Sequence, residues 1–378
     1  MSRNKIFVAI LILVSLGACR ERYDPPIVSS SNRFLVIEGI LNAGNGVTDI
    51  ILSRSFKLDD TARLAFEPNA QVVVEGADNS VRPLTSLGNG TYRSPNLGLT
   101  IGQEYRLRIN TPDGKEYLSD YVVAKETPEI DSVGWRQTSE GVRFYVNTDD
   151  PSNNTRYYKW DFDETWEIRT YYHSFYIYEN GIVRERTPSE DVSTCWKHGK
   201  SNQIIVGSTA RLQNDVMFEA PLHFISKNDE KLSVRYSVLV RQSALDKAGF
   251  EFYELMKRNT ESVGTVFDPQ PSEIWGNIRC ISDPAEMVIG YVSVATINEK
   301  RIFVSNTQLQ NWIYPQYCPP VDVVNHPDSL ALAFGSGLSP FDAIFSPSGP
   351  QIIGYVSANK PCVECTSRGG SLVRPSFW

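Results

Sequence analysis

Short segments rich in β-branched and aromatic residues recur along most of this chain, and glycine, asparagine, aspartate and proline separate them. In YRLRI, residues 105–109, apolar and basic side chains alternate, as they do in an antiparallel strand with one buried face. Many short strands at this spacing are typical of a β-sandwich. We therefore predict a mainly β protein, with an immunoglobulin-like β-sandwich at residues 33–127 and a larger β-rich sandwich domain at residues 128–378.

One segment has a helical pattern instead. In residues 243–263 the apolar side chains of Phe252, Leu255 and Met256 recur at helical spacing. Ser243, at the start, is a residue type that commonly caps helix N-termini. We predict one amphipathic helix here, packed by its apolar face on the second sandwich.

The N-terminus has the features of a bacterial lipoprotein signal peptide. Two basic residues precede an apolar run at residues 6–16, which is too short for a permanent membrane span, and Leu-Gly-Ala-Cys follows. The signal peptidase needs small side chains beside its cut, and the thiol of Cys19 would carry the lipid. We predict a signal peptide at residues 1–18, a lipid anchor at Cys19 and an extended tether at residues 19–32. An ordinary secretory signal with an incidental cysteine is the alternative.

The charge of the chain argues against nucleic acid as a partner. Its formal net charge is −7, whereas nucleic-acid binding rewards basic surfaces. No later apolar run approaches the roughly 18 residues of a membrane-spanning helix. We therefore predict contact with a membrane through the lipid alone.

The sequence contains no motif for a metal or a cofactor. Its four histidines (His173, His198, His223 and His326) do not have the spacing of a zinc-binding helix. There is also no nucleophile elbow, phosphate loop or dinucleotide-binding fingerprint. We predict no cofactor, no metal site and no catalytic residues of these classes.

Carboxylates cluster in DFDETWE, residues 161–167, where Asp161 and Asp163 would share one face of a strand. A hydrolase could use such a pair, and Ca²⁺ could bind it. A solvated strand edge, where charge discourages edge-to-edge pairing, is the interpretation that we favour.

Aromatic side chains are dense in residues 157–178, and strand alternation predicts that some of them lie outside the core. Exposed rings mark a protein partner or a sugar-like ligand, whereas a thick aromatic core is the alternative. The predicted contact surface consists of Trp160, Trp166, Tyr171, Tyr172 and Tyr176.

Five cysteines remain besides the lipidated one, and an exported chain is expected to oxidise them. Because five is odd, at least one thiol stays free unless a bond joins two chains. Cys362 and Cys365 can close a small loop, and a Cys280–Cys318 bond would tie down the final stretch, which leaves Cys195 over. Connectivity cannot be deduced from sequence, so this pairing is a hypothesis.

The C-x-x-C spacing of the last two cysteines also occurs in redox dithiols and zinc sites. A redox dithiol opens a helix, whereas TSRGG follows here, and zinc would need a second pair at matching spacing. We predict a structural staple, after which Gly369 and Gly370 bend the chain so that Phe377 and Trp378 dock on the fold.

Several phrases, in this order, resemble one family: LVIEGILN, YSVLVRQSAL, FDPQPSEIWGNIRCISDP and, at the C-terminus, CVECTSRGGSLVRPSFW. They are similar to the Bacteroidota lipoproteins that carry domain of unknown function 4249. The resemblance implies an accessory lipoprotein that works with outer-membrane TonB-dependent transporters in nutrient uptake. It implies no catalytic residues.

We therefore predict an outer-membrane lipoprotein that is a non-catalytic accessory or ligand-capturing partner of a TonB-dependent transporter. Surface-exported lipoproteins of this phylum often carry an acidic run after the lipidated cysteine, and RERYD departs from it. The periplasmic and cell-surface faces of the membrane thus both stay open. The alternatives are a cell-surface adhesin or matrix-binding module, and a hydrolase that uses the Asp161/Asp163 region.

Overall fold

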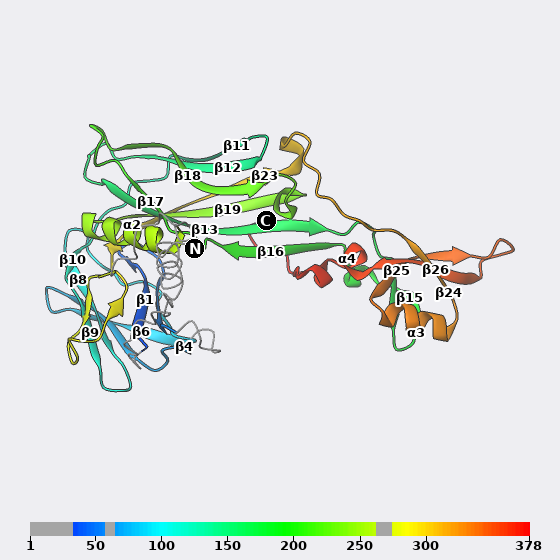
Figure 1. Cartoon of the computed structure of the whole chain (residues 1–378), viewed down its shortest axis with the longest axis horizontal. Coiled ribbons are helices and arrows are strands. Elements are labelled where there is room, and N and C mark those ends of the chain that lie inside the picture. The colour runs from blue at the N-terminus through cyan, green and yellow to red at the C-terminus, as the bar shows by residue number, and fades with distance from the viewer. Residues whose placement is uncertain (1–32, 57–64, 262–273) are drawn as a thin grey trace, which may run out of the picture.

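The computed structural model describes residues 33–56, 65–261 and 274–378. Of these described residues, 47% are in strands and 12% are in helices, which confirms the prediction of a mainly β protein. Figure 1 shows an N-terminal sandwich, a central sandwich with long strands, and a smaller part that projects from the far end of the central sandwich. The predicted signal peptide, the tether and Cys19 lie outside the described residues.

The N-terminal sandwich is built from strands whose side chains alternate between buried and exposed. In β8 the apolar side chains of Tyr105, Leu107 and Ile109 are fully buried and the two arginines between them are not, as predicted. The first ten strands are β1 (Leu35–Gly39), β2 (Leu41–Asn42), β3 (Thr48–Arg54), β4 (Ala65–Phe66), β5 (Gln71–Gly76), β6 (Val81–Gly88), β7 (Thr91–Ser94), β8 (Glu104–Asn110), β9 (Glu116–Ser119) and β10 (Val122–Val123).

Three later strands complete this sandwich, so the predicted range of residues 33–127 omits part of it. β20 (Ile278–Cys280) pairs with β9, while β21 (Val288–Ile289) and β22 (Val294–Ala295) lie parallel to β1 and β2. The strand order is β20-β9-β8-β5-β6-β7-β3-β1-β21, with β4 on β3 and β10 on β8. Strands of two or three residues show no recognisable alternation. β20 and β21 are positioned by pairing with edges of β9 and β1 that would otherwise stay open, and β22 is positioned by pairing with β2.

The central sandwich packs a three-stranded sheet on a five-stranded sheet. Side chains at even positions of β13, such as Trp160 and Phe162, point into its core, and those at odd positions, such as Lys159 and Asp161, point outward. The first sheet has the order β11 (Ser132–Gln137), β12 (Gly141–Asp149), β18 (Val216–Ser226). The second has the order β16 (Thr194–Lys200), β13 (Tyr157–Arg169), β19 (Arg235–Ala244), β23 (Ile297–Ser305), with β17 (Ile205–Ser208) also on β13.

The predicted helix is present as α2 (Lys247–Glu261), but it begins later than expected. Ser243 is not its cap, because the pairing of β19 with β13 and β23 continues through Ser243. Asp246 caps the helix instead, and its Oδ1 accepts a hydrogen bond from the Gly249 N–H at 2.8 Å. The last two residues of the predicted range lie outside the described residues.

The projecting part, here termed the distal module, is formed by residues 170–192 and 313–363. Its small core contains Tyr176, Val323, Leu330, Phe334 and Tyr355. The sequence did not predict a separate module, because its two halves are far apart along the chain. Its elements are β14 (Tyr176–Glu179), β15 (Ile182–Glu185), η1 (Pro188–Glu190), β24 (Val321–Val324), α3 (Pro327–Gly335), β25 (Leu338–Phe345), β26 (Ile352–Asn359) and α4 (Lys360–Val363). Three further turns of 3₁₀ helix, η2 (Glu230–Leu232), η3 (Asn306–Gln308) and η4 (Cys365–Arg368), lie outside the module.

The disulfides correct the predicted pairing. Cys195 is bonded to Cys365 and Cys318 to Cys362, while Cys280 is a buried free thiol. Cys362 lies in α4 and Cys365 opens η4, so each faces a different segment of the chain although only two residues separate them.

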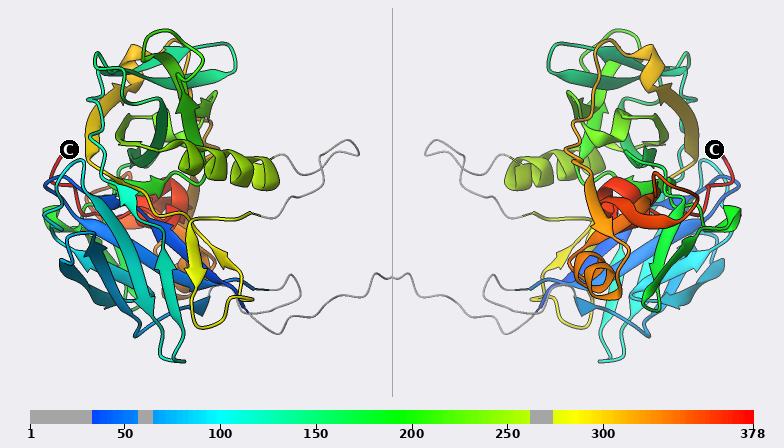
Figure 2. Two further views of the ribbon diagram at one scale, coloured as in Figure 1. Left: turned by 90° about the vertical axis from the view of Figure 1, so that its left-hand side faces the viewer. Right: turned by 90° about the vertical axis from the view of Figure 1, so that its right-hand side faces the viewer.

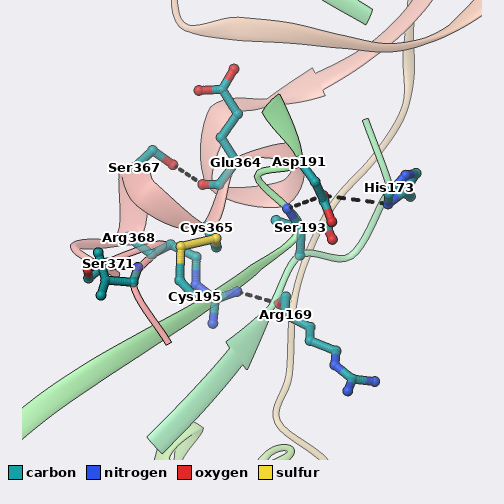
Figure 3. The surroundings of a disulfide bond; sticks show 12 residues. Arg169, His173, Asp191, Ser193, Cys195, Glu364, Cys365, Ser367, Arg368 and Ser371 are labelled. Carbon is teal, nitrogen blue, oxygen red and sulfur yellow. Dashed lines mark hydrogen bonds and ion pairs between the residues drawn. A yellow bond between two sulfur atoms is a disulfide. The ribbon is translucent and has the colours of Figure 1, made fainter. Parts of the chain in front are cut away.

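The first of these bonds joins η4 to β16 (Figure 3). Beside it, the Arg368 guanidinium donates to the carbonyl oxygen of Arg169 at 2.8 Å, and the Ser367 hydroxyl donates to the carbonyl oxygen of Glu364 at 2.7 Å. The predicted staple therefore fastens the tail to the central sandwich and does not close a local loop.

Residues 365–378, here termed the C-terminal clasp, run back over the five-stranded sheet. The backbones of Trp196 and Ser371 exchange two hydrogen bonds, at 2.8 and 2.9 Å. The Trp378 ring meets the Phe303 ring edge-on with centroids 5.6 Å apart, and Phe377 covers an arginine of β23. The predicted docking of Phe377 and Trp378 is confirmed.

Candidate functional site

A cleft of about 500 Å³, here termed the junction cleft, lies where the N-terminal sandwich, β13 and α2 meet. Both side views in Figure 2 place α2 at the level where the blue and cyan strands of the N-terminal sandwich meet the green strands of the central one. Its polar lining residues include Glu38 of β1, Lys159 and Asp161 of β13, and Tyr253 of α2. Concave sites at domain junctions are common places for small ligands.

Lys159 is the central charge of the junction cleft. Its Nζ donates to Asp161 Oδ2 at 2.6 Å and lies 5.5 Å from the centre of the Tyr253 ring. Burial disfavours the charged amine, but Asp161, Tyr253 and Glu38 outweigh burial and raise the pKa of Lys159. For Tyr253, burial disfavours the charged phenolate and so raises the pKa of the hydroxyl. The cleft therefore presents a charged lysine and a neutral phenol near neutral pH.

Asp161 and Asp163 share the outer face of β13, as the sequence predicts, but they do not act as a pair. Asp161 is bound by Lys159, whereas Asp163 is bound by Arg241, which also bonds Glu299 at 2.8 Å. Each carboxylate thus has its own basic partner. This arrangement gives no support to two carboxylates that flank one substrate bond.

The inner end of the junction cleft carries an unpaired polar group. A small extension of about 90 Å³ is lined by Lys159, Tyr253 and Ser293. Within the described residues, the buried hydroxyl of Ser293 has no hydrogen-bond partner. Because buried hydroxyls are rarely left unpaired, this hydroxyl is a candidate partner for a polar atom of a bound ligand.

The predicted aromatic contact surface does not form. Trp160 and Tyr176 are only 1% and 8% exposed and belong to the cores of two different parts of the molecule. Trp166 packs against the central core, and Tyr172 stacks on Phe341 with ring centroids 4.0 Å apart. Of the five, only Tyr171 is largely exposed, at 59%. The chain leaves β13 at Arg169, so the later rings enter the distal module and not one continuous face.

The sequence pattern identified Asp161 but not the residues that form the cleft around it. Lys159 lies two residues earlier on the same strand, so strand alternation alone could have placed both side chains on one face. Tyr253 and Ser293 could not be found in this way, since their positions depend on how α2 and the strands after it pack.

Comparison with known proteins gives a family. Its model, described as "Domain of unknown function (DUF4249)", matches residues 20–301, well over half of the chain. The chain belongs to the DUF4249 family. A search of curated proteins gave no match.

Solved structures resemble this DUF4249 chain only weakly. A Salmonella alpha-2-macroglobulin mutant matches with a TM-score of 0.18 and 11% identity, over 87% of this chain but 18% of its own. A putative carbohydrate-binding protein from Bacteroides uniformis matches with a TM-score of 0.15 and 9% identity, over 57% of this chain and 91% of its own. The DUF4249 chain thus spans under a fifth of the first structure, and likeness at this level supports no statement about the site.

The distal module of the DUF4249 chain exposes large apolar side chains, of which only Tyr171 belonged to the predicted contact surface. Tyr317 is 90% exposed and Leu332 is 77% exposed. Leu332 lies on α3, whose Leu330 and Phe334 are buried, so a helical-face analysis of that segment could have identified it. We term the exposed apolar side chains of the module the apolar patch. It includes Tyr171, Ile313, Tyr317, Val324, Leu332 and Phe345, of which the first three line one shallow depression.

Two observations concern other kinds of site in the DUF4249 chain. Across the ranges that the structure describes, no three His, Cys, Asp or Glu side chains are grouped so that they could hold a metal ion. Over the same ranges, no helix has the length and apolar character needed to cross a membrane.

Proposed function

We propose that this chain is an outer-membrane lipoprotein that captures a ligand and delivers it, as a non-catalytic partner, to a TonB-dependent transporter in nutrient uptake. The lipobox that ends at Cys19 supports lipid anchoring. Membership of the DUF4249 family is compatible with this role and does not by itself assign it.

The observation that carries the proposal is the apolar patch. The distal module projects away from both sandwiches (Figure 1). The two disulfides fasten it at and near its base. Large exposed apolar side chains on a soluble surface mark a place where another protein docks. A membrane-embedded barrel is the partner proposed here, because a lipid anchor holds the chain at the same membrane.

The junction cleft supports the second half of the proposal. It lies in the body of the molecule, separate from the apolar patch, so a ligand in the cleft and a partner on the distal module can be bound together. A polar ligand in the cleft can be oriented by the Lys159–Asp161 ion pair, by the Tyr253 ring and by the unpaired hydroxyl of Ser293. The rival hydrolase function gains no comparable support from the separately paired Asp161 and Asp163.

Co-purification from native outer membranes in mild detergent tests this proposal. We expect the tagged wild-type protein to recover a barrel transporter in stoichiometric amount. Tyr317→Asp and Leu332→Asp should lower that recovery about tenfold or more, because a charge placed within an apolar interface removes a hot spot.

Phe218→Asp is the matched control, since Phe218 is 76% exposed on β18, outside the distal module. This variant should recover the transporter as the wild type does. Absence of any barrel from the wild-type preparation would contradict the transport role. Equal recovery by all variants would contradict docking through the distal module.

A further inference from the structure

A second pocket, here termed the clasp pocket, lies farther along the outer face of the five-stranded sheet. It encloses about 410 Å³ beside the C-terminal clasp. Thr165, His198, Lys200, Arg301 and Phe377 are among the residues that line it. It shares no lining residue with the junction cleft, so a ligand in the clasp pocket requires neither that cleft nor a transporter partner.

Strand register explains why two basic side chains line opposite sides of this pocket. Asp163 of β13 is paired with Lys200 on one side and with Leu239 on the other, and Leu239 is paired with Arg301. Lys200 and Arg301 therefore lie in one row across the sheet. His198 is paired with Thr165 in the next row, and the Thr165 hydroxyl and His198 Nδ1 are 2.9 Å apart.

Two carboxylates, Asp163 and Glu164, also line the pocket, but each already has a basic partner. Asp163 is bound by Arg241, and the buried Glu164 is bound by Lys231 at 2.6 Å. Within the described ranges, neither Lys200 nor Arg301 forms an ion pair with a carboxylate. The pocket thus holds two uncommitted positive charges in a chain whose net charge is −7.

Arg301 is held in position without being neutralised. One of its Nη atoms donates to the Ser237 hydroxyl at 3.0 Å, and its Cζ lies 3.6 Å from the centre of the Phe377 ring. Burial lowers the pKa of Arg301, and the charge of Arg241 lowers it further against the opposing effects of Asp163 and Glu299. A bound anion would relieve this unfavourable setting.

The wall formed by Phe377 is fixed by the rest of the clasp. The Arg235 guanidinium lies over the rings of both Phe303 and Trp378, and the Trp378 Nε1–H donates to Glu167 Oε2 at 3.3 Å. The Phe377 ring therefore lies against the guanidinium of Arg301 and lines the pocket on that side.

We propose that the clasp pocket binds a small ligand in which a carboxylate or phosphate group is carried on a sugar ring. The oxyanion lies between Arg301 and Lys200, which attract it from two sides of the pocket, because a guanidinium fork and an ammonium match its geometry and charge. His198 adds a ring nitrogen that is not committed to Thr165. The sugar ring packs against the part of the Phe377 ring that Arg301 leaves exposed, and the pocket volume suits a ligand of this size.

Isothermal titration calorimetry on the full chain in detergent, with D-glucuronate, D-glucose 6-phosphate and D-glucose as probes, tests the proposal. We expect at least one of the two anions to bind and glucose not to bind. The anion that binds tells whether the ligand group is a carboxylate or a phosphate. Failure of both anions at millimolar concentration, or binding of glucose as tight as theirs, overturns the proposal.

Variants locate the site. Arg301→Gln and Lys200→Gln should each weaken binding of the anion about tenfold or more, since each removes a charge-assisted hydrogen bond. Arg143→Gln is the matched control, because Arg143 also lies over a phenylalanine ring, that of Phe224, but on the other sheet of the sandwich. It should bind as the wild type does.

Thermal unfolding of each variant separates loss of binding from loss of fold. Lys200 is exposed at the end of β16, so Lys200→Gln tests the site even if Arg301→Gln does not fold. Wild-type affinity in Lys200→Gln together with wild-type affinity in a folded Arg301→Gln would place the anion elsewhere and overturn the assignment.

Discussion

At the residue scale, one carboxylate holds the C-terminal clasp to the central sandwich. Glu230 accepts a hydrogen bond from Lys197 Nζ at 2.6 Å and is also bound by Arg368 of η4. Burial alone would raise the pKa of Glu230, but the hydrogen bonds from Lys197 and Arg368 outweigh burial and lower that pKa. Folding therefore favours the deprotonated carboxylate.

The lowered pKa of Glu230 predicts a pH dependence of stability. Above the unfolded-state pKa of about 4.3 its contribution is fully present, and it is lost as the pH falls through the lower folded-state pKa, because the unfolded chain takes up the proton first. Glu230→Gln should lower the free energy of unfolding at pH 7 by about 1–3 kcal/mol, and its difference from wild type should shrink as the pH falls below about 4.

Urea unfolding at pH 7 and at several lower pH values measures both effects. Glu179→Gln is the control, since Glu179 is half exposed and its ion pair with Arg184 is shared with Glu190; an exposed pair contributes little. A deficit of Glu230→Gln that stays the same at every pH would contradict the linkage.

At the element scale, α2 shows how a helix start is decided by its neighbours. The Asp246 side chain caps the helix through the Gly249 N–H and also accepts a hydrogen bond from the Tyr291 hydroxyl at 2.7 Å. Tyr291 follows β21, so the same carboxylate ties α2 to the N-terminal sandwich. The cap is therefore both local and tertiary.

Asp246→Ala should lower the free energy of unfolding by about 1–2 kcal/mol through loss of the cap. Loss of the hydrogen bond from Tyr291 should lower it further. Asp246→Asn keeps an oxygen for the Gly249 N–H and should recover most of the cap. Tyr291→Phe removes only the tertiary bond. Chemical unfolding of the three variants gives the comparison, and equal stabilities of Asp246→Ala and wild type would refute the assignment of Asp246 as cap.

The same element shows what the sequence can and cannot predict. The alternation in residues 105–109 was sufficient for β8, because burial of one strand face is a local pattern. The apolar spacing around Phe252 was likewise sufficient for the existence of α2. Its start was predicted wrongly, because Ser243 is held in a ladder by strands that are remote in sequence.

For the junction cleft, the sequence could identify Asp161 and its outward face but not the ring of Tyr253 against Lys159. That contact depends on the packing of α2 between two sandwiches. The predicted disulfide pairing was wrong for a related reason. The short spacing of Cys362 and Cys365 favoured a local bond, whereas tertiary structure places each beside a distant cysteine.

At the scale of the whole molecule, the disulfides decide how firmly the distal module is attached. Cys318–Cys362 closes the base of the module, and Cys195–Cys365 ties the chain that leaves it to β16. The two sandwiches have separate cores that contain none of these four cysteines. The bonds therefore stabilise the module and the clasp more than the body of the protein.

Replacing both Cys318 and Cys362 with serine should increase backbone hydrogen exchange in the distal module, since a native disulfide of this kind contributes about 2–5 kcal/mol. Exchange in β13 and β19 should stay as in the wild type, because their core is formed without these cysteines. Hydrogen exchange with mass spectrometry measures both regions in one experiment. Cys280→Ser is the control, since Cys280 is a free thiol and its change breaks no bond. Faster exchange throughout the central sandwich, or no increase in exchange in the distal module, would show that the Cys318–Cys362 bond does not stabilise the module locally.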